Sequence, residues 1–318
     1  MTAGSPADAN VSDLLPNGVQ RGVALARFST LKCGGPAELF ARVGDAAQLV
    51  GLLAWADSRK VAVSVVGSGS NLLIADEGVA GLVLKLDREL ARIRADGSVL
   101  VCGAGARLPS VAARAAREGL SGIEFGVNIP GSVGGAVRMN AGAYGGELQH
   151  ILAWVDVATA AGVQRRTAAD LGMAYRSSNL GSGHVVSEAA FALEPAPPES
   201  VRATIATMRA SRQQAQPSGI KTFGSTFKNP DAAALRAAGN AAAGQTAGQL
   251  LEAAGCRGLQ VGRARFSPEH ANFVENTGGA TTADAVALMA EGRRRVSEAF
   301  GIALEPEVQL LGPVRFPW

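Results

Sequence analysis

Two glycine-rich segments carry the clearest potential for chemistry in this sequence. The first, residues 67–76, reads GSGSNLLIAD and follows the apolar run VAVSVVG. Small residues there let successive backbone N–H groups cradle a phosphate pair, and a bulky residue at Gly69 should fill that space. The dinucleotide fingerprint requires a third glycine that opens a helix, whereas Leu72 stands at that position. We therefore expect an anion-binding loop outside a Rossmann fold, with an ordinary turn between strands as the alternative.

The second segment, residues 129–146, reads IPGSVGGAVRMNAGAYGG. A flexible linker would contain more serine and more charge, so this composition indicates a packed loop that brings backbone close to a flat ligand. Two such cradles in successive α/β units suggest a bipartite FAD site, with one cradle for the pyrophosphate and one for the isoalloxazine ring. Two ordinary turns are the alternative.

Alternating strands and helices must position both segments. The first unit is predicted to contain a strand, a helix and two strands, at 37–43, 45–60, 61–67 and 81–86. The second is predicted to contain the same series, at 98–105, 108–120, 151–160 and 184–193. A helix over 198–216 ends before Pro217, and a third unit follows, with a helix at 247–255 and strands at 259–267, 271–277 and 304–312. Thr281 and Asp284 predict a capping box for a helix that runs to Phe300.

Composition narrows the class of protein. A chain of 318 residues exceeds the usual single domain of roughly 100 to 200 residues, so several cores are expected. The net charge of +3 is small, and three dispersed cysteines together with the scattered His150, His184 and His270 do not form a metal motif. No basic leader and no apolar run of about 18 residues is present. We expect a cytoplasmic protein without a metal, a membrane segment or a nucleic-acid partner.

Six blocks carry a family resemblance, namely GSGSNLLIAD, IPGSVGGAVRMNAGAYGG, AYRSS, FGSTFKNP, AGQLLEAAGCRGLQVGRARFSPEHANFVEN and LEPEVQLLG. In this order they resemble the UDP-N-acetylenolpyruvoylglucosamine reductases, or UDP-N-acetylmuramate dehydrogenases, over residues 28–312. The resemblance implies an α+β fold with a two-lobed FAD-binding domain of the vanillyl-alcohol-oxidase (PCMH) type and a C-terminal α+β substrate-binding domain. We place a flexible tail at 1–20, the lobes at about 21–87 and 88–213, and the substrate-binding domain at 214–318.

The resemblance also implies the reaction and three catalytic residues. NADPH reduces noncovalent FAD, and a hydride from flavin N5 then adds to the enolpyruvyl group of UDP-N-acetylglucosamine enolpyruvate, which gives UDP-N-acetylmuramate for peptidoglycan. Arg176 would stabilise the charge that develops on the substrate. Ser225 would deliver a proton to carbon. The catalytic role of Glu307 is implied by the resemblance alone. Glu305, Glu307 and Gln309 share one face of the predicted strand, so strand periodicity does not single out Glu307.

The remaining site residues are expected in two groups. FAD contacts are predicted along both glycine segments, at Gly67, Ser68, Gly69, Ser70, Asn71, Leu72, Pro130, Gly131, Ser132, Gly134, Gly135, Asn140, Ala141 and Gly142. Substrate contacts are predicted at Tyr175, Lys228, Asn229 and His270, although a structural role for His270 is an open alternative.

The chain departs from the family pattern in its length between two motifs. The interval from Arg176 to Ser225 is 225 − 176 = 49 residues, which resembles the shorter type II variant of the family and leaves the uridine contacts open. Two other functions compete with the reductase. One is a different flavin-dependent oxidoreductase on the same fold, and the other is a binding protein for nucleotide or nucleic acid, suggested by 25 arginines against five lysines. A monomer is expected.

Overall fold

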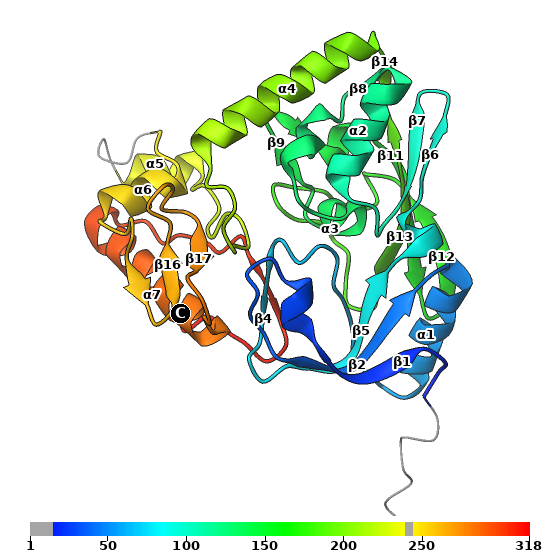
Figure 1. Cartoon of the computed structure of the whole chain (residues 1–318), viewed down its shortest axis with the longest axis horizontal. Helices are drawn as coiled ribbons and strands as arrows, with labels where there is room; N and C mark the ends of the chain where they lie inside the picture. The colour runs from blue at the N-terminus through cyan, green and yellow to red at the C-terminus, as the bar shows by residue number, and fades with distance from the viewer. Residues whose placement is uncertain (1–14, 239–243) are drawn as a thin grey trace, which may run out of the picture.

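The computed structural model of the chain describes residues 15–238 and 244–318 (Figure 1). The first lobe is a four-stranded sheet in the order β1-β2-β5-β3 with one helix, α1 (Ala46–Ser58). Its strands are β1 (Val19–Ala24), β2 (Pro36–Val43), β3 (Val63–Val65) and β5 (Val79–Leu86). Alternate residues of β2 face opposite sides of the sheet. Leu39 packs in the core that contains α1, whereas Phe40 packs in a separate cluster on the other face.

The second lobe is an antiparallel sheet in the order β12-β11-β13-β7-β6. Its strands are β6 (Ile93–Asp96), β7 (Val99–Gly103), β11 (Leu152–Thr159), β12 (Gly162–Arg166) and β13 (Val185–Ala192). Helices α2 (Leu108–Glu118), α3 (Val133–Arg138) and α4 (Pro198–Ala215) belong to this lobe. The largest hydrophobic core is continuous through both lobes, because Leu82 of β5 and Leu100 of β7 belong to the same cluster. The two lobes therefore share one hydrophobic core.

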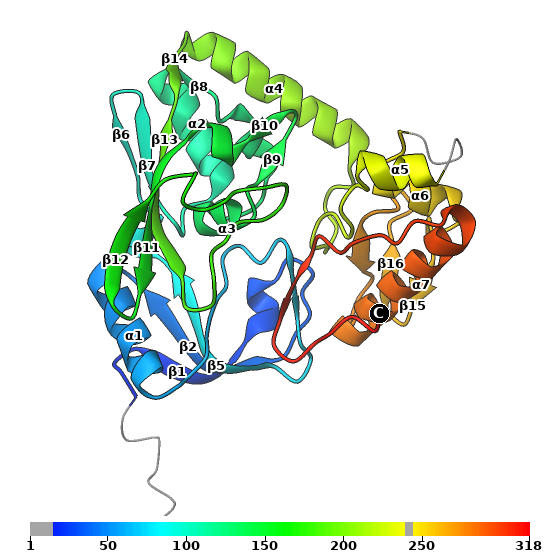
Figure 2. The ribbon, with the colours of Figure 1, turned by 180° about the vertical axis from the view of Figure 1, so that it is seen from behind.

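Short elements complete the second lobe and the connections. The 3-10 helices are η2 (Leu25–Phe28), η3 (Arg88–Ala91), η4 (Glu124–Asn128) and η5 (Leu148–His150). Two small antiparallel pairs are β8 (Leu120–Ser121) with β14 (Glu194–Pro195), and β9 (Gly142–Ala143) with β10 (Gly146–Glu147). In Figure 2, α4 is seen to span the distance between the second lobe and the C-terminal helices.

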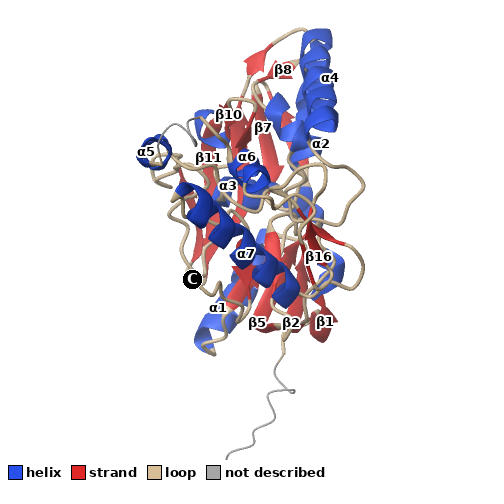
Figure 3. Ribbon diagram, turned by 90° about the vertical axis from the view of Figure 1, so that its left-hand side faces the viewer, coloured by secondary structure: helices blue, strands red, loops and turns tan. Residues whose placement is uncertain are grey.

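The C-terminal domain packs around the helices α6 (Ala247–Ala253) and α7 (Thr282–Phe300), in a second core to which Leu31, Cys33 and Leu73 of the first lobe also contribute. Its remaining elements are α5 (Ala232–Ala237), β15 (Gln260–Val261), β16 (Ala264–Phe266), β17 (Val274–Asn276) and β18 (Gln309–Leu311). Figure 3 shows α7 lying across this domain. The predicted capping box is confirmed, because Thr281 and Asp284 exchange reciprocal side-chain to backbone hydrogen bonds.

The first lobe is bonded directly to the C-terminal domain. Strand β4 (Leu72–Ile74), which immediately follows the first glycine loop, pairs in parallel with β18 at the end of the chain. The Asp76 carboxylate accepts hydrogen bonds from the backbone N–H groups of Thr282 and Ala283 at the start of α7, at 2.8 and 2.9 Å. A carboxylate at a helix N-terminus is a favourable cap. These contacts hold the first glycine loop against the C-terminal domain.

Several sequence-based boundaries differ from the structure. The predicted tail lies outside the described residues up to residue 14, and β1 already begins at Val19. The predicted strand 259–267 is a hairpin that turns at Gly262, whose φ is +54°. The second glycine segment contains the helix α3 and the β9–β10 hairpin. Within the described residues, no helix is both long and apolar enough to cross a membrane.

The shared strand face predicted for Glu305 and Glu307 is wrong. Only residues from Gln309 onward form β18, and the chain bends at Val308. The side chain of Glu305 is 76% exposed, whereas that of Glu307 is 19% exposed. The irregular backbone therefore separates the two carboxylates, and only Glu307 faces the interior.

Candidate active site

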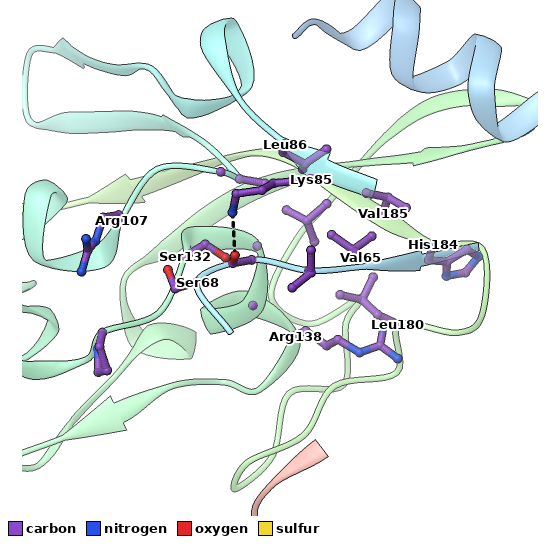
Figure 4. A pocket seen from close by; sticks show the side chains of 18 of the residues that line it. Val65, Ser68, Lys85, Leu86, Arg107, Ser132, Arg138, Leu180, His184 and Val185 are labelled. Carbon is purple, nitrogen blue, oxygen red and sulfur yellow. Dashed lines mark hydrogen bonds between the residues drawn. The ribbon is translucent and has the colours of Figure 1, made fainter. Parts of the chain in front are cut away.

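A cavity of about 370 Å³ lies between the two lobes and is lined by both glycine segments (Figure 4). Its volume falls in the usual range for ligand sites in proteins. Six of the predicted cofactor residues line it, namely Gly67, Ser68, Pro130, Ser132, Gly134 and Gly135. Strands β5 and β13 supply much of the opposite wall through Lys85, Leu86, Val185 and Val186.

Direct packing between the glycine segments explains why their residues are small. A Cβ atom added to Gly67 would lie 2.2 Å from the Ser132 hydroxyl oxygen, and one added to Gly134 would lie 3.0 Å from the Cβ atom of Ala104. Gly69 has a different reason to be glycine. Its φ is +65°, and an added Cβ atom would lie 1.8 Å from the carbonyl oxygen of Phe28, so protein backbone fills the space that we had expected a pyrophosphate to need.

Basic side chains at the cavity were missed by the sequence analysis. Lys85 donates a 2.8 Å hydrogen bond from Nζ to the carbonyl oxygen of Gly67, and Arg107 and Arg138 also line the cavity (Figure 4). Burial lowers the pKa of the Lys85 ammonium, and the neighbouring Arg42 lowers it further. The available signal was one lysine inside the otherwise apolar strand GLVLKL.

These features fit the diphosphate part of FAD. The cavity is lined by small residues of both glycine segments, and the Lys85 ammonium and the Arg107 and Arg138 guanidinium groups favour a dianion. Lys85, Ser68, Ser132 and Arg107 are the residues that would hold it.

A second group of side chains, which we call the charged cluster, consists of Arg176, Glu307 and Lys228. Arg176 Nε donates to Glu307 Oε1 at 3.1 Å, and its Nη2 donates to the carbonyl oxygen of Gly142 at 2.9 Å. The side chains of Arg176 and Glu307 are only 18% and 19% exposed. Arg176 occupies a tight turn closed by hydrogen bonds between Ala174 and Ser177, and its φ is +56°. A positive φ at a non-glycine residue is uncommon and is typical of functional sites.

Backbone hydrogen bonds bring Ser225 to the same place. The N–H group of Glu307 donates to the carbonyl oxygen of Thr226 at 2.9 Å, so Ser225 lies one residue from a direct bond to the Glu307 segment. The Asn71 side chain donates to the carbonyl oxygen of Glu307 at 3.2 Å. A Cβ atom added to Gly224 would lie 3.6 Å from the carbonyl oxygen of Ser70. The segments of Ser225 and Glu307 and the first glycine loop therefore meet.

The electrostatics of Glu307 are set by two opposing effects. Burial raises the pKa of its carboxyl group, while the positive charges of Arg176 and Lys228 act in the opposite direction. Lys228 also lies 3.5 Å from Glu305 Oε2. When the Glu307 carboxyl group gains or loses a proton, the charge next to the Arg176 guanidinium therefore changes.

The predicted substrate residues divide into two pairs. Tyr175 lies under the Arg176 guanidinium, 4.8 Å from ring centroid to Cζ, and Lys228 belongs to the charged cluster. Asn229 Oδ1 instead accepts a hydrogen bond from the Ala247 N–H at the start of α6. The ring of His270 packs in the C-terminal domain, where Nδ1 accepts from the Asn272 N–H at 3.2 Å and burial lowers the pKa of the imidazole. Contact of all four residues with substrate remains a prediction.

The other predicted cofactor residues are not among those that line the cavity. Ser70 and Asn71 contact the C-terminal segments described above, and Leu72 begins β4. Asn140 and Gly142 contact the Arg176 turn, while Gly131 and Ala141 complete the same segment. Among the described residues, no group of three His, Cys, Asp or Glu side chains is arranged to hold a metal ion.

Comparisons with known proteins agree with this geometry. Residues 37–168 match the FAD binding domain, and residues 216–311 match the C-terminal domain of UDP-N-acetylenolpyruvoylglucosamine reductase. A reductase of this name from Symbiobacterium thermophilum is 40% identical over 95% of this chain and 94% of its own length. Another, from an Anaeromyxobacter species, is 42% identical over 92% and 89% of the two chains. The crystal structure of the Thermus caldophilus reductase is similar with a TM-score of 0.78 and 36% identity, over 92% of this chain and 98% of that one.

These matches span nearly the whole chain and both parts of the site, which confirms the resemblance found in the sequence blocks. The fold is accordingly α+β, with a two-lobed FAD-binding domain of the PCMH type followed by a C-terminal domain. The chain belongs to the UDP-N-acetylenolpyruvoylglucosamine reductases, the FAD- and NADPH-dependent oxidoreductases of peptidoglycan precursor synthesis.

Proposed function

We propose that this chain uses NADPH to reduce the enolpyruvyl group of UDP-N-acetylglucosamine enolpyruvate, and that Arg176, Ser225 and Glu307 carry the step at the substrate. The observation that supports this most directly is the convergence of these residues. The Arg176–Glu307 pair, with 3.1 Å between Nε and Oε1, lies one backbone hydrogen bond from the Ser225 segment and beside the first glycine loop.

Arg176 would act on the charge that appears during reduction. FAD, when bound, supplies a hydride to the vinyl methylene of the substrate, and negative charge then develops on the adjacent carbon and its carboxylate. The Arg176 guanidinium is fixed by two acceptors, Glu307 Oε1 and the Gly142 carbonyl oxygen, so it is oriented before the substrate arrives. A preorganised cation in a partly desolvated site stabilises such charge without reorganising.

Ser225 would deliver the proton to that carbon. A hydroxyl is a weak acid, so proton transfer needs neighbouring positive charge. Arg176 and Lys228 both act on the carboxyl group of Glu307, whose backbone is bonded to the residue after Ser225. Glu307 would hold the Arg176 guanidinium in place and would balance its positive charge while the Ser225 proton moves to the substrate carbon.

The domain limits lie close to element boundaries. We assign the two lobes of the FAD-binding domain to about residues 21–87 and 88–213 and the substrate-binding domain to 214–318, although β1 begins at Val19 and α4 ends at Ala215, so the limits at 21 and 214 fall just inside these two elements. Support comes from the change of sheet between β5 and β6 and from the separate core around α6 and α7. We further propose a cytoplasmic monomer, since NADPH is a cytoplasmic reductant. Light scattering of the purified protein would test the monomer.

The visible spectrum of the purified protein tests the reaction. The native protein should be yellow, should be bleached by NADPH, and should recover its colour when UDP-N-acetylglucosamine enolpyruvate is added without oxygen. Recovery only with oxygen would favour a different flavin-dependent oxidoreductase on the same fold. A protein that neither carries nor takes up FAD would contradict the proposal.

A further inference from the structure

Asn140 lies in the second glycine segment but is not among the residues that line the cavity. It is fully buried, and its φ is +40°, a left-handed conformation that asparagine tolerates better than most residues. The side chain therefore has a fixed position inside the second lobe. Its contacts show what that position serves.

The amide group of Asn140 is fully engaged in hydrogen bonds. Nδ2 donates to Glu147 Oε2 and to the carbonyl oxygen of Ala174, both at 3.2 Å, and Oδ1 accepts from the Gln149 N–H at 3.0 Å. Gln149 in turn donates from Nε2 to Glu147 Oε2 at 2.8 Å. A carboxamide has two donor hydrogens, and both have protein acceptors here. No donor remains for a bound cofactor.

The bond to Ala174 fixes one end of the Arg176 turn. Ala174 and Ser177 close that turn, and Arg176 lies within it at φ +56°. Two residues after Asn140, the carbonyl oxygen of Gly142 accepts from Arg176 Nη2 at 2.9 Å. The segment 140–142 thus holds both the backbone of the turn and the guanidinium that projects from it.

The hairpin that continues this segment is anchored at its far end. Tyr144, at its tip, has a φ of +52°, and its hydroxyl donates to the carbonyl oxygen of Met208 in α4 at 3.2 Å. Asn128 donates to the Tyr144 hydroxyl at 3.0 Å. Because the hairpin is tied to α4 at one end, Asn140 can hold the Arg176 turn against a fixed support.

We propose that Asn140 is a positioning residue that orients the Arg176 guanidinium for substrate reduction by holding the Ala174 carbonyl group. This inference rests on the proposed role of Arg176. It differs from the cofactor contact that the sequence predicted for Asn140, because a cofactor contact would act on FAD binding and on both halves of the reaction.

Asn140→Gly tests the inference, since glycine accepts a positive φ and the substitution removes the side chain with its amide. The FAD-loaded variant should keep native FAD affinity and be bleached by NADPH at the native rate. Its recovery with UDP-N-acetylglucosamine enolpyruvate should slow by up to about 10²-fold, the cost of displacing a catalytic group by roughly 1 Å. Asn179→Gly is the matched control. Asn179 lies three residues after Arg176, and its amide donates to the Asp170 carbonyl oxygen outside the Arg176 turn, so this control should behave as native.

A double variant separates this inference from the role of Arg176. If Asn140 acts through Arg176, adding Asn140→Gly to Arg176→Ala should slow recovery no further. Multiplied effects would overturn the inference, as would a weakened FAD affinity with both half-reactions slowed equally. Native recovery in Asn140→Gly, with slow recovery in Arg176→Ala, would overturn it while leaving the proposed function intact. Native recovery in Arg176→Ala itself would instead overturn the proposed function.

Asn140→Asp keeps the test usable if the glycine variant does not fold. It retains an acceptor for the Gln149 N–H and tolerates a positive φ, but its carboxylate faces the Ala174 carbonyl oxygen and the Glu147 carboxylate without a donor. The same split between the half-reactions is expected. If both half-reactions were slowed equally relative to the native protein, the inference would be contradicted.

Discussion

The cavity and the charged cluster are built in opposite ways. The cavity is made largely of backbone and small residues from two segments, and packing such as that of Gly67 against Ser132 shapes it. The charged cluster is made of long side chains from three distant parts of the chain, joined by the ion pair of Arg176 with Glu307, 131 residues apart in sequence. Two continuous segments of the sequence thus form most of the cavity, whereas tertiary contacts between distant residues assemble the charged cluster.

This contrast predicts that substitutions in the two regions affect different steps of the reaction. Substitutions at the cavity should lower FAD affinity, because added atoms occupy ligand space. Substitutions in or beside the charged cluster should leave FAD bound and slow only the step at the substrate, because negative charge develops on the substrate in that step and a substrate carbon gains a proton.

The largest effect is expected for Ser225→Ala. Recovery of the flavin colour with UDP-N-acetylglucosamine enolpyruvate should slow by about 10² to 10⁴-fold, the usual cost of losing a general acid. Bleaching by NADPH should remain near the native rate, because that step needs no proton from the hydroxyl. Rapid-mixing absorbance measures both steps. Ser225→Cys should regain part of the lost rate, since a thiol is more acidic than a hydroxyl. Unslowed recovery in Ser225→Ala would show that another group supplies the proton.

A smaller effect is expected for Gly135→Leu at the cavity. Gly135 lies in α3, and a Cβ atom added there would meet only the Ser132 hydroxyl oxygen at 3.5 Å, so the side chain should project into ligand space without breaking the fold. Such crowding costs about 1 to 3 kcal/mol, or roughly 10 to 100-fold in FAD affinity. Quenching of flavin fluorescence on binding would measure it.

Gly51→Leu provides the control for this cavity variant. Gly51 is also a helical glycine, in α1, and an added Cβ atom there has nothing within 4 Å. The gain in helix propensity is the same for both substitutions. FAD affinity should be native in Gly51→Leu, and equal losses in both variants would remove the cavity from the binding site.

The smallest effect concerns the pH dependence of stability at the charged cluster. Burial raises the pKa of Glu307 in the folded chain, so its ionisation opposes folding. Relative to Glu307→Gln, the native protein should be most stable below the ordinary glutamic acid pKa and should lose that advantage as pH rises through the raised value. Urea unfolding of both proteins across this range would measure the change. A native advantage that grows with pH would mean that the Arg176 charge outweighs burial.

Without the family resemblance, local sequence predicted the cavity better than the charged cluster. Glycine spacing is a local signal, and residues such as Gly67 and Ser132 do line the cavity. Lys85 was missed because one lysine in an apolar strand is a weak local signal that does not show which way the side chain points. Glu307 could not be distinguished from Glu305 by strand periodicity, because the chain bends before β18 and only tertiary contact with Arg176 selects one carboxylate.

The reason for a residue type was also harder to predict than its position. Gly69 is required by the approach of the Phe28 carbonyl oxygen, a contact 41 residues away in sequence. The amide of Asn140 is used by Ala174, Glu147 and Gln149. In both cases the relevant neighbour comes from another part of the chain, so local sequence identified the segment and not its function.

Two-step rapid mixing of FAD-loaded Arg176→Ala is the most direct test of this division between cavity and charged cluster. Mixing with NADPH should bleach the flavin at the native rate, because the cavity is unchanged. A second mixing with UDP-N-acetylglucosamine enolpyruvate should restore the colour about 10² to 10³-fold more slowly, the usual cost of removing a preorganised electrostatic donor. Equal slowing of both steps, or recovery at the native rate, would contradict the assignment of Arg176 to the step at the substrate.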